Sequence, residues 1–113
     1  MPTGSTAYAL SCGGPIMHPD LDAIVLAPMI PHTLSSRPIV VHGDSRIKLQ
    51  ISEYNNLNPH VTCDGQTHVV TQPGDEVIIS KSPRVLNLIH PKDHNFYDTC
   101  RTKLGWASST GAT

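Results

Sequence analysis

The residues best suited to chemistry lie near the start of the chain, where hydroxyl side chains surround a glycine. Thr3, Ser5 and Thr6 flank Gly4, and the segment PTGSTAYALSCGG that contains them has the pattern of a short helix ended by glycine. The first N–H groups of a helix, together with its dipole, favour a bound phosphate, and hydroxyls add donors and acceptors. Because Ser and Thr also cap ordinary helices, this pattern alone leaves ligand binding and simple capping both open.

Histidines and aspartates are the other candidate reactive groups. Only His90 and His94 have the i, i+4 spacing of helical metal ligands, and Pro91 between them argues against a shared helical face. Asp20 and Asp22 could form an acid–base pair, but they lie where an extended segment begins, and turn capping is the simpler role. These residues therefore predict neither a metal site nor a catalytic pair.

The composition indicates one loop-rich domain with neither a nucleic-acid nor a membrane signature. The 113 residues include ten prolines and eight glycines, and the formal net charge is −1 with basic residues scattered along the chain. The longest mostly apolar run, residues 23–31, is shorter than the roughly 20 residues that a spanning helix needs. The three cysteines form no CxxC pair, so we expect reduced thiols and a cytoplasmic protein.

The hydrophobic pattern predicts short antiparallel strands with a helix at each end. Residues 45–52 alternate, with Ile47, Leu49 and Ile51 on one face, which is typical of a strand with one solvated side. Asp64-Gly65-Gln66 is expected to be a three-residue hairpin connection. The expected strands cover residues 22–29, 39–41, 45–52, 60–63, 67–71, 76–81 and 85–89, and the expected helices cover residues 4–14 and 93–106.

Several motifs in the same order resemble the bacterial NAD kinases. The string PTGSTAYALSCGGPIMHPDLDAIVLAPMIPHTLSSRPIVV is followed by the DGQ turn at residues 64–66, by PGD at residues 73–75 and by IHPKD and TKLGW. The resemblance implies a mainly β, antiparallel β-sandwich-like C-terminal domain of the NAD kinase fold over residues 1–106, with a short helix at each end. Residues 107–113 are small and polar, and we expect them to form a disordered tail.

The resemblance also implies an activity, the transfer of a phosphoryl group from ATP to the adenosine ribose 2′-hydroxyl of NAD with a divalent metal such as Mg²⁺. The family's GGDG motif, which supplies the catalytic carboxylate, does not occur in this sequence. We therefore expect no catalytic residue and no metal ligand on this chain, an absent N-terminal α/β domain, and no activity of this part alone. Met1 stands where the family has the first Thr of TPTG, as at a truncation.

The family's dinucleotide contacts can be carried over to matching positions of this sequence. The implied NAD-binding residues come from the TAY stretch, the following helical turn, a segment near a subunit contact and the DGQ turn: Thr6, Ala7, Tyr8, Ser11, Ile30, Asp64 and Gln66. The implied partners are NAD, ATP, the missing N-terminal domain and further copies in a homo-oligomer.

Two alternatives remain open at this stage. One is the C-terminal domain of a lipid-kinase relative that acts on diacylglycerol or a sphingoid base, since such domains share the general β architecture. The other is a non-catalytic β-sandwich interaction module. The TAY and DGQ strings favour NAD binding over both.

Overall fold

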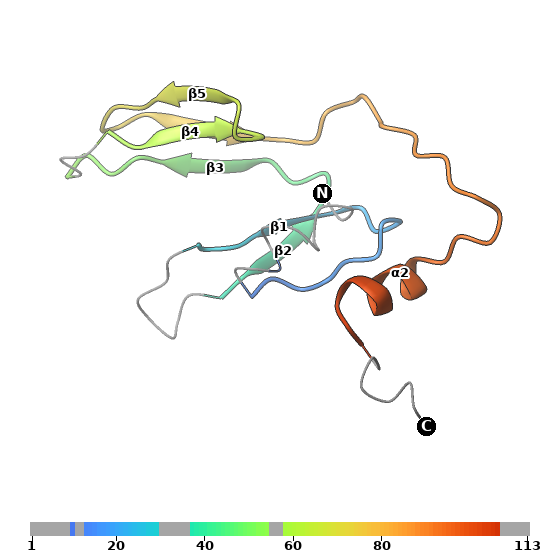
Figure 1. The fold of residues 1–113 in the computed structure, drawn as a ribbon. Coiled ribbons are helices and arrows are strands. Elements are labelled where there is room, and N and C mark those ends of the chain that lie inside the picture. The colour runs from blue at the N-terminus through green and yellow to red at the C-terminus, as the bar shows by residue number, and fades with distance from the viewer. Residues whose placement is uncertain (1–9, 11–12, 30–36, 55–57, 107–113) are drawn as a thin grey trace. The chain divides into compact units, whose positions relative to one another are not determined.

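The computed structural model describes residues 10, 13–29, 37–54 and 58–106, which form two compact units. Within Met1–Ser82 the described strands make three two-stranded antiparallel sheets, and Pro83–Thr113 contains a helix (Figure 1). The mainly β, antiparallel fold class and the C-terminal helix are thus confirmed. The helix predicted over residues 4–14 lies almost wholly outside the described residues, and the tail of residues 107–113 lies outside them entirely.

The first sheet pairs β1 (Ala23–Leu26) with β2 (Ile39–His42), seen side by side in Figure 1. Its sequences, AIVL and IVVH, are rich in β-branched residues, which fit the pleated surface of a strand. The antiparallel register places Ala23 opposite His42 and Leu26 opposite Ile39. The residues just before β1 and just after β2 therefore meet at one end of this sheet.

The second sheet pairs β3 (Ile47–Gln50) with β6 (Glu76–Ile79), and the third is the hairpin of β4 (His60–Cys63) and β5 (Thr67–Val70). The hairpin lies in sequence between β3 and β6, so one antiparallel pair is nested inside another. Ile47 and Ile51 are half-buried, as the alternating pattern predicts, whereas Leu49 is exposed.

The turn before β6 depends on the backbone of Gly74 and on the side chain of Asp75. Gly74 has a φ of 90°, a left-handed value that favours glycine at the third position of a type II turn. The Asp75 N–H donates to the Gln72 carbonyl at 3.0 Å, and the Asp75 carboxylate accepts from the Gln72 N–H at 2.8 Å. The turn predicted at residues 73–75 is thereby confirmed.

The second unit carries helix α2 (Phe96–Lys103), which begins at the N-cap Asn95. The Asn95 side chain accepts a hydrogen bond from the Tyr97 N–H at 2.8 Å, which satisfies one of the free donors of the first turn. Gly105, with a φ of 68°, lies just past the C-terminal end, where a left-handed residue commonly ends a helix. The Cys100 side chain is buried.

The strand predicted at residues 85–89 is wrong. This segment has no regular secondary structure, and its Val85 and Ile89 side chains are 80% and 97% exposed. A strand needs a neighbour for its backbone N–H and C=O groups, and none of the described strands pairs with this segment. The apolar run suggested a strand, but no second strand lies alongside it among the described residues.

Apolar side chains of the described residues are covered only sparsely. The buried hydrophobic side chains there are Met17 and Cys100, at 4% and 2% exposed. The larger set left open to solvent includes side chains from β2, β5, the 85–89 segment and α2, namely Ile39, Val40, Val69, Val70, Val85, Leu86, Leu88, Ile89 and Tyr97. No helix of the described part is long and apolar enough to cross a membrane.

Candidate functional site

The candidate site is built on the turn of the β4–β5 hairpin. Cys63 and Thr67 are paired across the strands, so three residues connect them, which confirms the predicted connection. The first two have left-handed backbones, Asp64 with a φ of 53° and Gly65 with a φ of 69°. The Gln66 N–H donates to the Cys63 carbonyl at 3.0 Å and closes the turn. Aspartate and glycine in this order are typical of such turns, because both tolerate a positive φ.

A cavity of about 590 Å³ opens at this turn. Its described walls are Thr62, Asp64 and Gly65 of the hairpin and Met29, which follows β1. The Asp64 carboxylate and the Thr62 hydroxyl supply hydrogen-bonding groups, while Met29 supplies an apolar, polarisable surface. A cavity of this size, with both polar groups and an apolar surface on its described wall, can hold part of a small molecule.

Of the seven predicted NAD-binding residues, the structure describes Asp64 and Gln66, and it places both in this turn. The other five, Thr6, Ala7, Tyr8, Ser11 and Ile30, lie outside the described residues. Met29, directly before Ile30 in the sequence, lines the same cavity as Asp64. The sheet containing β1 and the hairpin turn thus meet at one cavity, a proximity that sequence spacing does not reveal.

Sequence reasoning missed three wall residues of the cavity. Thr62 lies in β4, two positions before Asp64, and its sequence pattern marked it only as a strand residue. Gly65 was recognised only as part of the turn. Met29 carried no signal beyond its position next to Ile30, because a single methionine in an apolar run reads as packing.

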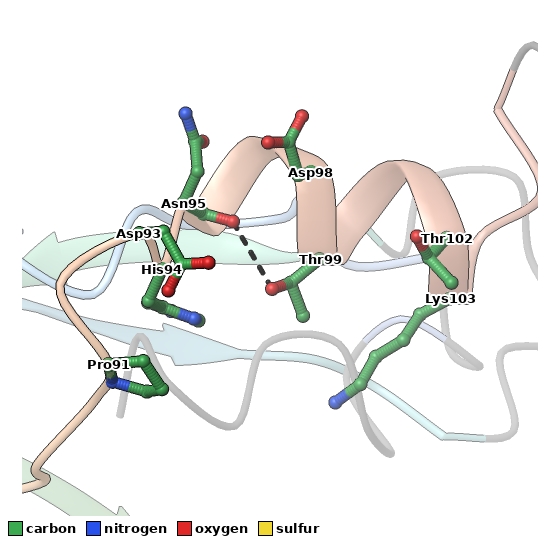
Figure 2. Close-up of a pocket in the computed structure, with 8 residues that line it drawn as sticks. All are labelled: Pro91, Asp93, His94, Asn95, Asp98, Thr99, Thr102 and Lys103. Carbon is green, nitrogen blue, oxygen red and sulfur yellow. Dashed lines mark hydrogen bonds between the residues drawn. The ribbon is translucent and has the colours of Figure 1, made fainter.

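A second cavity, of about 460 Å³, lies along the N-terminal half and one side of α2 (Figure 2). Figure 2 shows Thr99 and Lys103, one helical turn apart, projecting on the same side, and the Thr99 hydroxyl donates to the Asn95 carbonyl at 3.2 Å. The walls combine two aspartates, Asp93 and Asp98, with one lysine. None of the predicted site residues belongs to this cavity.

The two histidines with i, i+4 spacing lie against each other just before α2. His90 and His94 precede the helix, and their rings stack with centroids 3.9 Å apart and planes 8° apart. Since the nitrogen lone pairs lie in the ring planes, parallel stacked rings do not aim them at one point. Cys63 and Cys100 are free thiols, and Cys12 lies outside the described residues.

A different cluster does bring potential metal ligands together. Among the described residues, ligand atoms of Asp22, His42 and Asp44 lie within 4.8 Å of one another. The Lys81 ammonium, however, already lies between the two carboxylates, 3.0 Å from Asp22 Oδ1 and 3.1 Å from Asp44 Oδ1. The carboxylates of Asp20 and Asp22 have different neighbours, since Asp20 Oδ2 lies 3.6 Å from His18 Nδ1 and Asp22 Oδ1 accepts from Lys81 Nζ at 3.0 Å.

Comparison with known proteins identifies the family to which the chain belongs. The chain belongs to the ATP-NAD kinase C-terminal domain family, whose model matches residues 1–91. Among curated relatives, the NAD kinase of Saccharophagus degradans is 77% identical over 110 residues, and that of Teredinibacter turnerae is 72% identical over 110 residues. Both matches cover 97% of this chain, and they cover 37% and 38% of the two relatives. The chain thus spans little more than a third of the length of these relatives.

A solved structure extends the similarity to the fold. The crystal structure of yeast NADH kinase complexed with NADH matches 95% of this chain and 34% of that one, with a TM-score of 0.73 and 28% sequence identity. The predicted resemblance to the NAD kinases is therefore confirmed. The family match decides against the lipid-kinase alternative.

Proposed function

We propose that this chain forms the NAD-binding part of an NAD kinase, which phosphorylates the adenosine ribose 2′-hydroxyl of NAD with ATP. The observation that supports the proposal most directly is the cavity at the hairpin turn, which Asp64 of the β4–β5 turn and Met29, after β1, both line. The names of the relatives and the NADH-bound yeast kinase point to the same ligand class.

The proposed role of the chain is to hold the acceptor nucleotide. The carboxylate of Asp64 accepts hydrogen bonds from amide or hydroxyl groups of the dinucleotide, and Gln66 of the same turn adds an amide. Met29 covers an aromatic face, and Ile30 next to it contributes near a subunit contact. The remaining contacts in this proposal come from the N-terminal motif, from Thr6, Ala7, Tyr8 and Ser11.

The chemistry of phosphoryl transfer explains how binding of the acceptor nucleotide contributes to the reaction rate. The transferred group needs an aligned acceptor hydroxyl, a metal on the phosphates and a carboxylate that positions the hydroxyl. Fixing the acceptor makes its attack effectively unimolecular, which can remove about 7–11 kcal/mol of the barrier. The described cavity wall has one carboxylate, a poor donor set for Mg²⁺, so we assign the metal to the ATP phosphates and to the rest of the kinase.

Three further expectations belong to this proposal. The GGDG string is missing from the sequence, so the catalytic carboxylate is supplied by a part of the kinase N-terminal to this segment. The exposed apolar side chains are covered in the full protein by that N-terminal α/β domain and by other copies in a homo-oligomer. The enzyme acts in the cytoplasm.

The test is an assay for NADP formation from NAD, ATP and magnesium. The N-terminal two-thirds of the Saccharophagus degradans kinase, joined to this chain in place of its own C-terminal third, should turn over, and this chain alone should not. Turnover by this chain alone would contradict the absence of a catalytic carboxylate. A folded chimera that binds ATP but not NAD would contradict the binding role and would favour a non-catalytic interaction module.

A further inference from the structure

One ammonium group connects the ends of two different sheets. Asp22 directly precedes β1, Asp44 follows β2, and Lys81 follows β6. Lys81 Nζ lies 3.0 Å from both carboxylate oxygens of Asp22 and 3.1 Å from Asp44 Oδ1. Lys81 and Asp22 are 59 residues apart in the sequence, so this contact joins the β1–β2 sheet to the β3–β6 sheet.

Backbone hydrogen bonds around Gly43 hold the residues that carry the two carboxylates near each other. The Gly43 N–H donates to the Asp22 carbonyl at 2.9 Å, and a Cβ at position 43 would overlap with Asp22 Oδ1. Glycine at this position therefore leaves the room that the Asp22 side chain occupies. The Asp44 N–H donates to His42 Nδ1 at 3.1 Å, which holds the other end of the turn. These two bonds bring the backbones of Asp22 and Asp44 to the same end of the β1–β2 sheet.

The charges around Lys81 are complementary. Asp22 and Asp44 face it from the β1–β2 sheet, and His42 Nδ1 lies 3.6 Å from Asp44 Oδ2. The hydrogen bond to Asp22 raises the pKa of Lys81, and the hydrogen bond from Lys81 lowers the pKa of Asp44. Because the side chains are about half exposed or more, salt should screen the attraction.

We propose that Lys81 is an ionic clasp that fixes the end of β6 against the β1–β2 sheet. The comparison within the molecule is Lys48, whose Nζ lies 3.6 Å from Glu76 Oε1 and which spans two strands of one sheet. Lys81 instead links sheets that lack a shared strand. Ser82, the next residue, is the last of the first unit, so the clasp holds the point at which the chain leaves that unit.

The experiment measures amide hydrogen exchange by NMR in the full 113-residue chain. Lys81→Met should speed exchange of the Gly43 N–H several-fold, and the matched control Lys48→Met should leave it unchanged. In 1 M NaCl, where the Debye length is about 3 Å, the unmodified chain should move toward the rate of Lys81→Met, and Lys81→Met should move little.

A double-mutant cycle assigns the effect to the pair. In an Asp22→Asn background, Lys81→Met should change the Gly43 exchange rate far less than it does in the unmodified chain. An equal effect in both backgrounds, or a Lys81→Met chain with unchanged exchange, would overturn the proposal. If Lys81→Met does not fold, the salt titration of the unmodified chain decides alone, and a Gly43 rate that is independent of salt would overturn it.

Discussion

Thr71 closes the base of the β4–β5 hairpin on Pro59, because both its N–H and its hydroxyl donate to the Pro59 carbonyl. The Thr71 side chain is 4% exposed, so its hydroxyl needs a partner within the protein. These two hydrogen bonds lie at the opposite end of the hairpin from the Asp64 turn. By joining the two strands at the base of the hairpin, these hydrogen bonds stabilise the hairpin whose turn lines the cavity.

Removal of the Thr71 hydroxyl should weaken this closure. We expect Thr71→Val to lower the free energy of unfolding by about 1 kcal/mol, because the shape is kept and one hydrogen bond is lost. Urea unfolding of the two chains provides the measurement. Thr71→Ser, which keeps the hydroxyl, serves as the control for the bond, and equal stability of Thr71→Val and the unmodified chain would contradict its contribution.

Gly65 should tolerate a side chain sterically but not conformationally. A Cβ at this position would meet no atom within 4 Å, yet its φ is 69°. Gly65→Ala is therefore expected to cost about 1–2 kcal/mol of hairpin stability, the cost of a left-handed alanine. Gly65→Asn, which accepts this conformation more readily, should cost less. Hydrogen-exchange rates of the hairpin amides measure the loss of stability in each variant. A larger loss in Gly65→Asn than in Gly65→Ala would contradict the explanation.

Asp64 provides the sharpest test of the proposed NAD site. In the active chimera, Asp64→Asn should weaken NAD binding about tenfold or more, as expected for a lost hydrogen bond to a charged acceptor. Asparagine also tolerates the left-handed φ of 53°, so the turn itself should persist. Isothermal titration with NAD is the measurement. Asp20→Asn removes a similarly exposed carboxylate outside the cavity wall and should leave the affinity unchanged.

The pH dependence of the clasp follows from its two shifted groups. The pKa of Asp44 is lowered, so its contribution is present above the ordinary aspartate pKa and is lost as pH falls through the folded value. The pKa of Lys81 is raised, so its contribution is present below the ordinary lysine pKa and is lost as pH rises through the folded value.

The stability difference between the unmodified chain and Lys81→Met should therefore be constant from about pH 5 to pH 9. It should shrink below about pH 4 and above about pH 10. Denaturant unfolding at each pH measures the difference. A difference that changes between about pH 5 and pH 9 would contradict this explanation.

The cap of α2 can be tested without touching either cavity-lining aspartate. Asn95→Ala removes the acceptor of the Tyr97 N–H and should cost about 1 kcal/mol of helix stability. Asn95→Asp keeps an acceptor at the N-terminus, where negative charge is favourable, and should preserve the helix. Circular dichroism and amide exchange of α2 distinguish the two, and an equal loss in both variants would contradict the capping role.

The strands and turns were predictable where local pattern decides the structure. The alternating pattern predicted β3. The Asp-Gly and Pro-Gly-Asp turns predicted where β5 and β6 begin, because these turns need particular backbone conformations. The 85–89 segment was not predictable in this way, since an apolar run forms a strand only when another strand lies beside it. The same limit applies to Met29 and Lys81, whose partners come from sheets distant in sequence.

The nested arrangement of β4 and β5 between β3 and β6 has a consequence for the order of folding. Pairing β3 with β6 directly would require closing a loop over residues 51–75, and the entropic cost of closure grows with loop length. The β4–β5 hairpin closes over only three residues and can form first, which brings Ile51 and Asp75 close before they bond. A slow step in refolding should therefore be sensitive to substitutions in the inner hairpin before it responds to those in the outer pair.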